Sequence, residues 1–178
     1  MVTSSAAVGD FEVHGELAAF RSDAVPGSGD FGDRRVIPKV VAGGSYRVPI
    51  GNGALVYGEY HYSGFGARSA EQIVPALRDP AFQERYLRGD TQILGRHAVA
   101  ALASYELAPE LALSSEWLLN PVDGSGVVVP SATWTVSYRW SVLLSGYVPY
   151  GFGPTGLSLG SEFGASPIAA FVQIRMYR

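Results

Sequence analysis

The sequence predicts an all-β fold, an up-and-down antiparallel β-barrel of about eight strands with a short helix in one long loop. Three observations predict this fold: stretches in which apolar and polar residues alternate, a composition rich in glycine and poor in charge, and connections that alternate in length. The chain has 178 residues, of which 22 are glycine and 16% are charged. Alternation with a period of two residues is typical of a strand with two unlike faces.

Length and composition set the limits of the prediction. A chain of 178 residues predicts one domain, residues 1–178, and glycine-rich pieces are too short to divide it. With no cysteine, the chain offers no disulfide and no thiolate site, and a net charge of −3 without a basic stripe argues against a nucleic-acid partner. Residues 1–15 lack the basic and apolar regions of an export signal, so an exported protein would be a mature form or a piece.

Turn-forming residues divide the chain into strands. Asn52-Gly53 is a strong tight-turn signal, and short corners at residues 107–110 and 137–141 separate two further pairs of strands. The predicted strands cover Gly9–Arg21, Val36–Val48, Gly53–Ser63, Ile93–Leu107, Glu110–Leu119, Val127–Ser137, Trp140–Pro149 and a last stretch from Pro167.

The connections between these strands predict the topology. Short turns follow the second, fourth and sixth strands, and longer segments follow the first, third, fifth and seventh. In a membrane barrel with an even number of strands, tight turns gather at the periplasmic rim and long loops gather outside. The third connection holds the predicted helix, which Ser69 caps, Asp79-Pro80 restarts and Gly89 ends. It is either a loop decoration, the simpler interpretation, or a lid or pore constriction.

Each predicted strand has one apolar and one polar face. In the last strand, Val172 and Ile174 lie on the apolar face, and Gln173 and Arg175 lie on the other. A soluble barrel would bury the apolar face, and a membrane barrel would turn it to lipid and line its lumen with the polar face. The low charge favours the membrane interpretation. The predicted lumen-lining residues are Glu12, His14, Glu16, Lys39, Arg47, Glu59, His61, Arg96, Glu106, Glu116 and Arg175.

Aromatic residues near strand ends also favour lipid. Amphipathic rings on the apolar faces would form girdles at the two membrane interfaces. The predicted membrane-interface residues are Tyr46, Tyr60, Tyr62, Tyr105, Trp134, Tyr138, Trp140 and Tyr150.

In these features the chain resembles bacterial outer-membrane β-barrel proteins. Its last strand, which alternates apolar residues and reaches Tyr177 before Arg178, is similar to the carboxy-terminal assembly signal of that class. The resemblance implies an outer-membrane location, the lipid bilayer and the barrel-insertion machinery as partners, and a complete barrel or the carboxy-terminal part of a larger porin-like one. It implies either a passive channel for ions or small solutes, or a structural barrel that acts through its external loops.

Two other functions stay open from the sequence. His61 and Ser63 share a face with Glu59, and this His-x-Ser order resembles the active-site strand of outer-membrane lipid A deacylases, although Gly64 stands where that family has asparagine. Residues i and i+2 of a strand lie roughly 7 Å apart, which is too far for a direct hydrogen bond. We therefore expect a polar network without a catalytic residue. The other alternative is a soluble ligand-binding β-barrel.

No cofactor or metal is predicted. His14, His61 and His97 fall on different strands, and no two of them have a ligand spacing.

Overall fold

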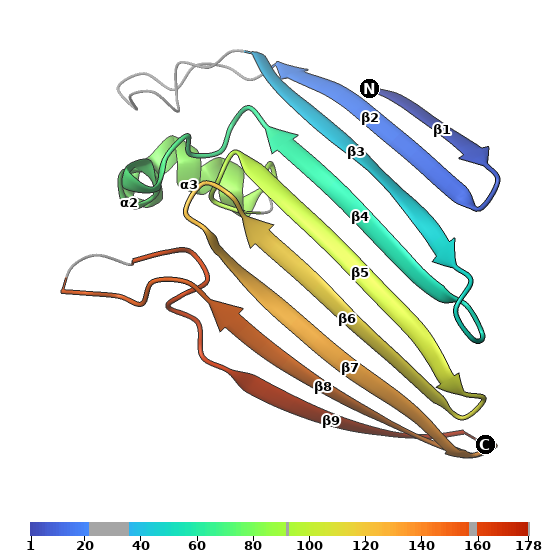
Figure 1. Ribbon diagram of the computed structural model, residues 1–178. Coiled ribbons are helices and arrows are strands. Elements are labelled where there is room, and N and C mark those ends of the chain that lie inside the picture. The colour runs from blue at the N-terminus through green and yellow to red at the C-terminus, as the bar shows by residue number, and fades with distance from the viewer. Residues whose placement is uncertain (22–35, 92, 157–159, 178) are drawn as a thin grey trace.

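The computed structural model describes residues 1–21, 36–91, 93–156 and 160–177. They form an antiparallel sheet of nine strands in which every strand pairs with its sequence neighbour (Figure 1). The strands are β1 (Val2–Val8), β2 (Phe11–Arg21), β3 (Val36–Val48), β4 (Ala54–Ser63), β5 (His97–Ala108), β6 (Leu111–Asn120), β7 (Ser125–Ser137), β8 (Trp140–Tyr150) and β9 (Ala169–Met176). The all-β, up-and-down antiparallel prediction is confirmed.

Strand β1 was not predicted. Its sequence, VTSSAAV, consists mostly of small residues, which give only a weak alternating pattern. A two-residue turn at Gly9 and Asp10 joins it to β2, and Gly9 has a φ of +62°, a conformation that glycine adopts without strain. The structure therefore has nine strands where the sequence predicted about eight.

The alternation of connection lengths is only partly confirmed. The connection between β6 and β7, predicted to be long, spans only residues 121–124, because β7 begins at Ser125. Asn120 and Asp123 explain this tight turn: Asn120 Oδ1 accepts the amide of Val122, and Asp123 Oδ1 accepts the amide of Ser125. The predicted long connection at residues 22–34 lies outside the described residues.

The described sheet is not closed, so the prediction of a transmembrane barrel is not confirmed. No pairing joins β1 to β9 in the part of the chain that the structure describes. With nine alternating strands, β1 and β9 run in the same direction, so they cannot pair with each other in an antiparallel way (Figure 1).

The predicted helix is two helices preceded by a 3-10 turn: η1 (Ala70–Gln72), α2 (Ile73–Arg78) and α3 (Pro80–Leu87). The helix restarts at Asp79-Pro80 as predicted: Asp79 caps α3, accepting the amides of Ala81 and Phe82, and Pro80 takes the first helical position. Ser69 precedes η1 but forms no side-chain cap. Among the described helices, none has the length and apolar character needed to cross a membrane.

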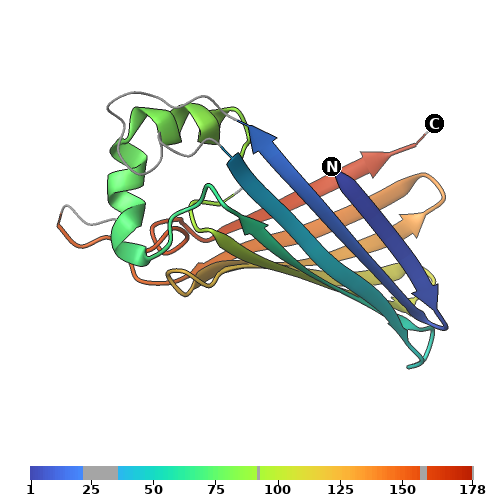
Figure 2. The ribbon, with the colours of Figure 1, turned by 90° about the horizontal axis from the view of Figure 1, so that it is seen from above.

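The buried apolar core lies where this helical segment meets the sheet. Phe65 and Phe82 are fully buried and stack with ring centroids 5.0 Å apart. Ile37, Ala67, Ile73, Ala76 and Leu94 complete the cluster, with Leu77 packed against it. Figure 2 shows the sheet curved like a trough, with the helices over one end of its concave side.

The pairing register assigns side chains to the two faces of the trough. Residues directly opposite one another in antiparallel strands point to the same face. His14, Gly43, Glu59, Ala100, Leu118 and Val127 are successive partners across β2 to β7, and we call their face the concave face. Leu17, Val40, Tyr62 and His97 are successive partners on the opposite side, the convex face.

Candidate functional site

The register places all the predicted lumen-lining strand residues on the concave face. Their partners show this: Glu12 and Tyr57 both lie opposite Ser45, Glu116 lies opposite Leu102, and Arg175 lies opposite Ser141. Arg96 precedes β5 and lines a cavity on the same side. The predicted interface aromatics lie on the convex face, except Tyr138, which is in the turn between β7 and β8.

Glu59 is the centre of the candidate site. Its two carboxylate oxygens accept hydrogen bonds from two imidazoles: Oε1 from His14 Nε2 at 2.8 Å and Oε2 from His61 Nε2 at 2.6 Å. The Tyr57 ring stacks on His14 with ring centroids 5.8 Å apart. The three partners come from β2 and β4, so the cluster reaches across β3.

Gly43 on β3 makes this contact possible. It lies opposite both His14 and Glu59 in the register. A Cβ atom at this position would lie 2.9 Å from His14 Cε1, 3.0 Å from Glu59 Cγ and 2.7 Å from the Gly58 carbonyl oxygen. The absence of a side chain therefore lets two side chains meet above the intervening strand.

We expect Gly43→Ala to destabilise the folded protein by about 1 to 3 kcal/mol, because the new methyl group overpacks the cluster and meets a backbone oxygen. The measurement is denaturant unfolding, with the imidazole NMR signals of His14 as the local readout. Gly58→Ala is the matched control, since a Cβ there meets nothing within 4 Å. Equal stabilities of the two variants would contradict the packing argument.

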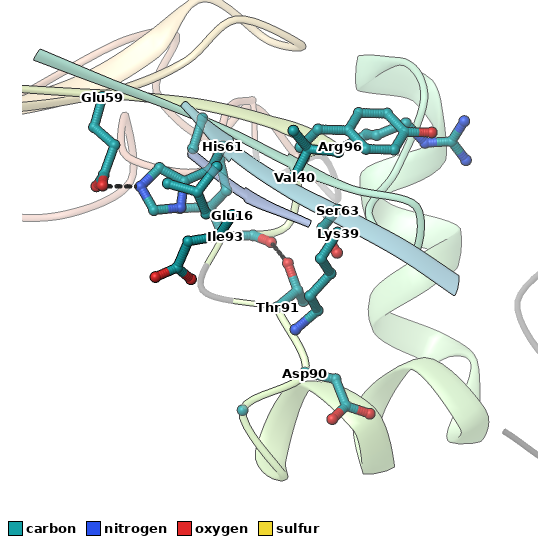
Figure 3. Close-up of a pocket in the computed structure, with 15 residues that line it drawn as sticks. Glu16, Lys39, Val40, Glu59, His61, Ser63, Asp90, Thr91, Ile93 and Arg96 are labelled. Carbon is teal, nitrogen blue, oxygen red and sulfur yellow. Dashed lines mark hydrogen bonds and ion pairs between the residues drawn. The ribbon is translucent and has the colours of Figure 1, made fainter. Parts of the chain in front are cut away.

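A cavity of about 290 Å³ adjoins the cluster. Figure 3 shows Lys39 extending from the sheet toward Thr91 and Asp90 of the segment that follows α3, while His61 is turned toward Glu59. Thr91 Oγ1 donates to the carbonyl oxygen of Ile93 at 2.6 Å, a bond within this segment. The helical segment thus narrows one end of the trough above a set of charged side chains.

The predicted pair His61 and Ser63 does not form a nucleophile–base contact. His61 Nε2 is hydrogen-bonded to Glu59, and Ser63 Oγ is buried with no hydrogen-bond partner among the described residues. An acyl-transfer site needs the base within hydrogen-bond reach of the hydroxyl. The geometry is that of a polar network centred on Glu59.

Other predicted lumen residues lie apart from this cluster. We call the end of the sheet that holds the β1–β2, β3–β4, β5–β6 and β7–β8 turns the short-turn end, and the opposite end the long-loop end. Arg47 and Glu106 border a separate hollow at the short-turn end. Arg175 donates to the side-chain oxygen of Gln173 on its own strand. Within the described ranges, Glu12, Glu16 and Glu116 form no ion pair.

A second polar network was not predicted. Glu162, in the β8–β9 connection, accepts hydrogen bonds from the Leu94 amide at 3.0 Å and from Asn120 Nδ2 at 2.8 Å. Its own amide donates to Asp123 Oδ2 at 2.7 Å. These bonds tie the β8–β9 connection to the helical segment and to the β6–β7 turn. Local sequence patterns do not identify these partners, because they lie far apart in the chain.

Burial raises the pKa of Glu162 above its ordinary value, although its hydrogen bonds oppose the shift. The folded state therefore holds the proton more tightly than the unfolded state, so this network loses stability as pH rises from the ordinary glutamate pKa through the raised one. We expect hydrogen-exchange protection of the Leu94 amide to fall across that window. Glu162→Gln should flatten this pH dependence of protection, and the control Glu84→Gln, at an exposed glutamate, should not. The same pH profile in the wild-type protein and in both variants would contradict this expectation.

Comparisons of the chain with protein-family models, with curated proteins and with solved structures find no match. Among the described residues, no group of three or more histidine, aspartate and glutamate side chains is arranged to hold a metal ion.

Proposed function

We propose that the nine strands form part of the wall of a bacterial outer-membrane β-barrel, a passive channel for ions or small solutes. The observation that carries the proposal is the exposure of the convex face, where apolar side chains are uncovered on strand after strand. Hydrocarbon chains would contact this face, and water would contact the concave face.

The size of this apolar face argues against water as its solvent. Soluble monomers rarely expose contiguous apolar patches above a few hundred Å². Trp117 is 57% exposed, Leu144 51% and Val172 68%, on three different strands. Further exposed side chains of the convex face are Val2, Val8, Phe11, Val13, Leu17, Val36, Val56, Leu113, Trp134, Trp140, Val148, Ile174 and Met176. A soluble ligand-binding barrel would need these side chains in its interior.

Strand length supports the same proposal. Strands β2 to β8 have 10 to 13 residues each. A strand tilted in a bilayer needs about 9 to 11 residues to cross the hydrocarbon. Soluble sheets more often use strands of about 5 or 6 residues.

The concave face would line the aqueous path. It carries the cluster of His14, Glu59 and His61 and the charged residues around it, and the helical segment covers its long-loop end. Buried charges without water would be costly, whereas a water-filled lumen solvates them. Under this proposal the helical segment is a constriction of the channel.

A closed antiparallel barrel would require further strands. Because β1 and β9 run in the same direction, an odd number of additional strands must stand between them. In hydrocarbon each unpaired backbone group costs several kcal/mol, so both edges would be paired in the membrane. Their pairing partners would run from the short-turn end to the long-loop end.

The test is reconstitution into planar bilayers together with gel migration in detergent. We expect the chain, assembled with the strands that close its sheet, to give stepwise ion conductance and to migrate faster before heating than after it. Heat-denatured protein from the same preparation is the control. A protein that remains in solution without detergent would contradict the membrane location. A protein that inserts into the bilayer without conductance would contradict the channel function.

A further inference from the structure

The concave face has a third hollow, of about 440 Å³, beside the Glu59 cluster. Two neighbouring rows of the register form it, and the small side chain of Ala100 lies at its floor between larger ones. The residues around the floor are Tyr57, Leu102, Leu118, Val127 and Val129. This volume is within the range of small-molecule sites, and the lining is largely apolar, which a purely aqueous path would not need.

One charged group lines this hollow. Glu116 lies in the same register row as Tyr57, with Leu102 opposite it on β5 and Val129 opposite it on β7. Its carboxylate has no hydrogen bond or ion pair to any residue that the structure describes. The nearest carboxylate in the next row is that of Glu59, and no lysine or arginine lines the hollow.

We infer that this hollow binds an organic cation with an apolar body. The apolar body would lie on Leu102, Leu118 and Val127, and the cationic group would lie between the Glu116 carboxylate and the face of the Tyr57 ring. A carboxylate and an aromatic face both attract a cation, and the aliphatic floor gains from removing apolar surface from water. An anion of the same size would be repelled by the Glu116 carboxylate and would meet no cationic side chain in the lining.

This inference deepens the proposed function, because it names the class of solute that the channel would favour. The binding itself does not require a bilayer, so it is tested in a non-ionic detergent. The probes are phenyltrimethylammonium and benzenesulfonate, which have similar size and opposite charge. Binding is followed through the methyl NMR signals of Leu102, Leu118 and Val127.

We expect saturable shifts with the cation and none with the anion. Glu116→Gln should raise the Kd for the cation about five-fold, the effect of losing one solvent-exposed charge pair. Glu106→Gln, the same change on the same face at the short-turn end, should leave the Kd unchanged. Ala100→Leu should fill the hollow and abolish the shifts while the protein stays folded.

Equal binding of both probes, or equal Kd values for the wild-type and Glu116→Gln proteins, would overturn the inference. Binding of the cation by a protein that fails to insert into bilayers would support the hollow and contradict the membrane proposal. Conductance in bilayers without binding of the cation would support the membrane proposal and contradict the inferred binding site.

Discussion

Replacing Leu144 by arginine is expected to cost about 2 to 4 kcal/mol of folding free energy in a bilayer, the penalty for an arginine at the lipid-facing midplane of a barrel. Leu144 lies on the convex face of β8, is 51% exposed, and has Val172 opposite it on β9. Its environment in the proposed structure is hydrocarbon, which cannot solvate a guanidinium group. The measurement is denaturant unfolding of the protein in lipid vesicles.

Leu143→Arg is the matched control for this prediction. Leu143 precedes Leu144 on β8, lies on the concave face and has Gln173 opposite it. An arginine there would reach the aqueous lumen, so we expect a much smaller loss. If Leu144→Arg instead made the protein more soluble in water without loss of stability, the convex face would be a water-exposed surface.

Phe82→Ala is expected to cost about 3 to 5 kcal/mol locally, because it removes a fully buried ring from the cluster that holds the helical segment to the sheet. Ile37 is the one residue of this cluster that lies within a described strand, so we expect the helices to undock while the sheet persists. Under the channel proposal, undocking widens the constriction and raises single-channel conductance. Hydrogen exchange of α3 and conductance in planar bilayers measure the two effects.

Leu87→Ala separates this effect from a general loss of helix stability. Leu87 is in the same helix and is 85% exposed, so truncating it removes no buried contact. We expect its exchange and conductance to match the wild-type values. Loss of strand protection in Phe82→Ala would show that the sheet depends on the core at its end, contrary to this account.

The sequence alone was sufficient to predict most of the strands. The strong alternation in β5 to β8 and the Asn52-Gly53 turn are local signals, so they survive in a single sequence. The weak alternation of β1 was missed because its small residues form little contrast between faces. Closure could not be decided, since it depends on which strands meet at the edges of β1 and β9.

The candidate site was predictable in part. The two-residue alternation along β4 was enough to place Glu59, His61 and Ser63 on one face. It gave no sign that His14 would reach Glu59 across β3. That contact depends on Gly43, whose role appears only when three strands are in register. The bonds of Glu162 to Leu94 and Asn120 likewise join residues far apart in the chain.

Quenching of tryptophan fluorescence tests most directly which solvent contacts the convex face. The chain has 3 tryptophans, and Trp117, Trp134 and Trp140 all lie on that face and are about half exposed. In vesicles of lipids with brominated acyl chains, we expect strong quenching of each one in single-tryptophan variants and little quenching by aqueous acrylamide. Efficient quenching by acrylamide with no effect of the brominated lipids would contradict the account.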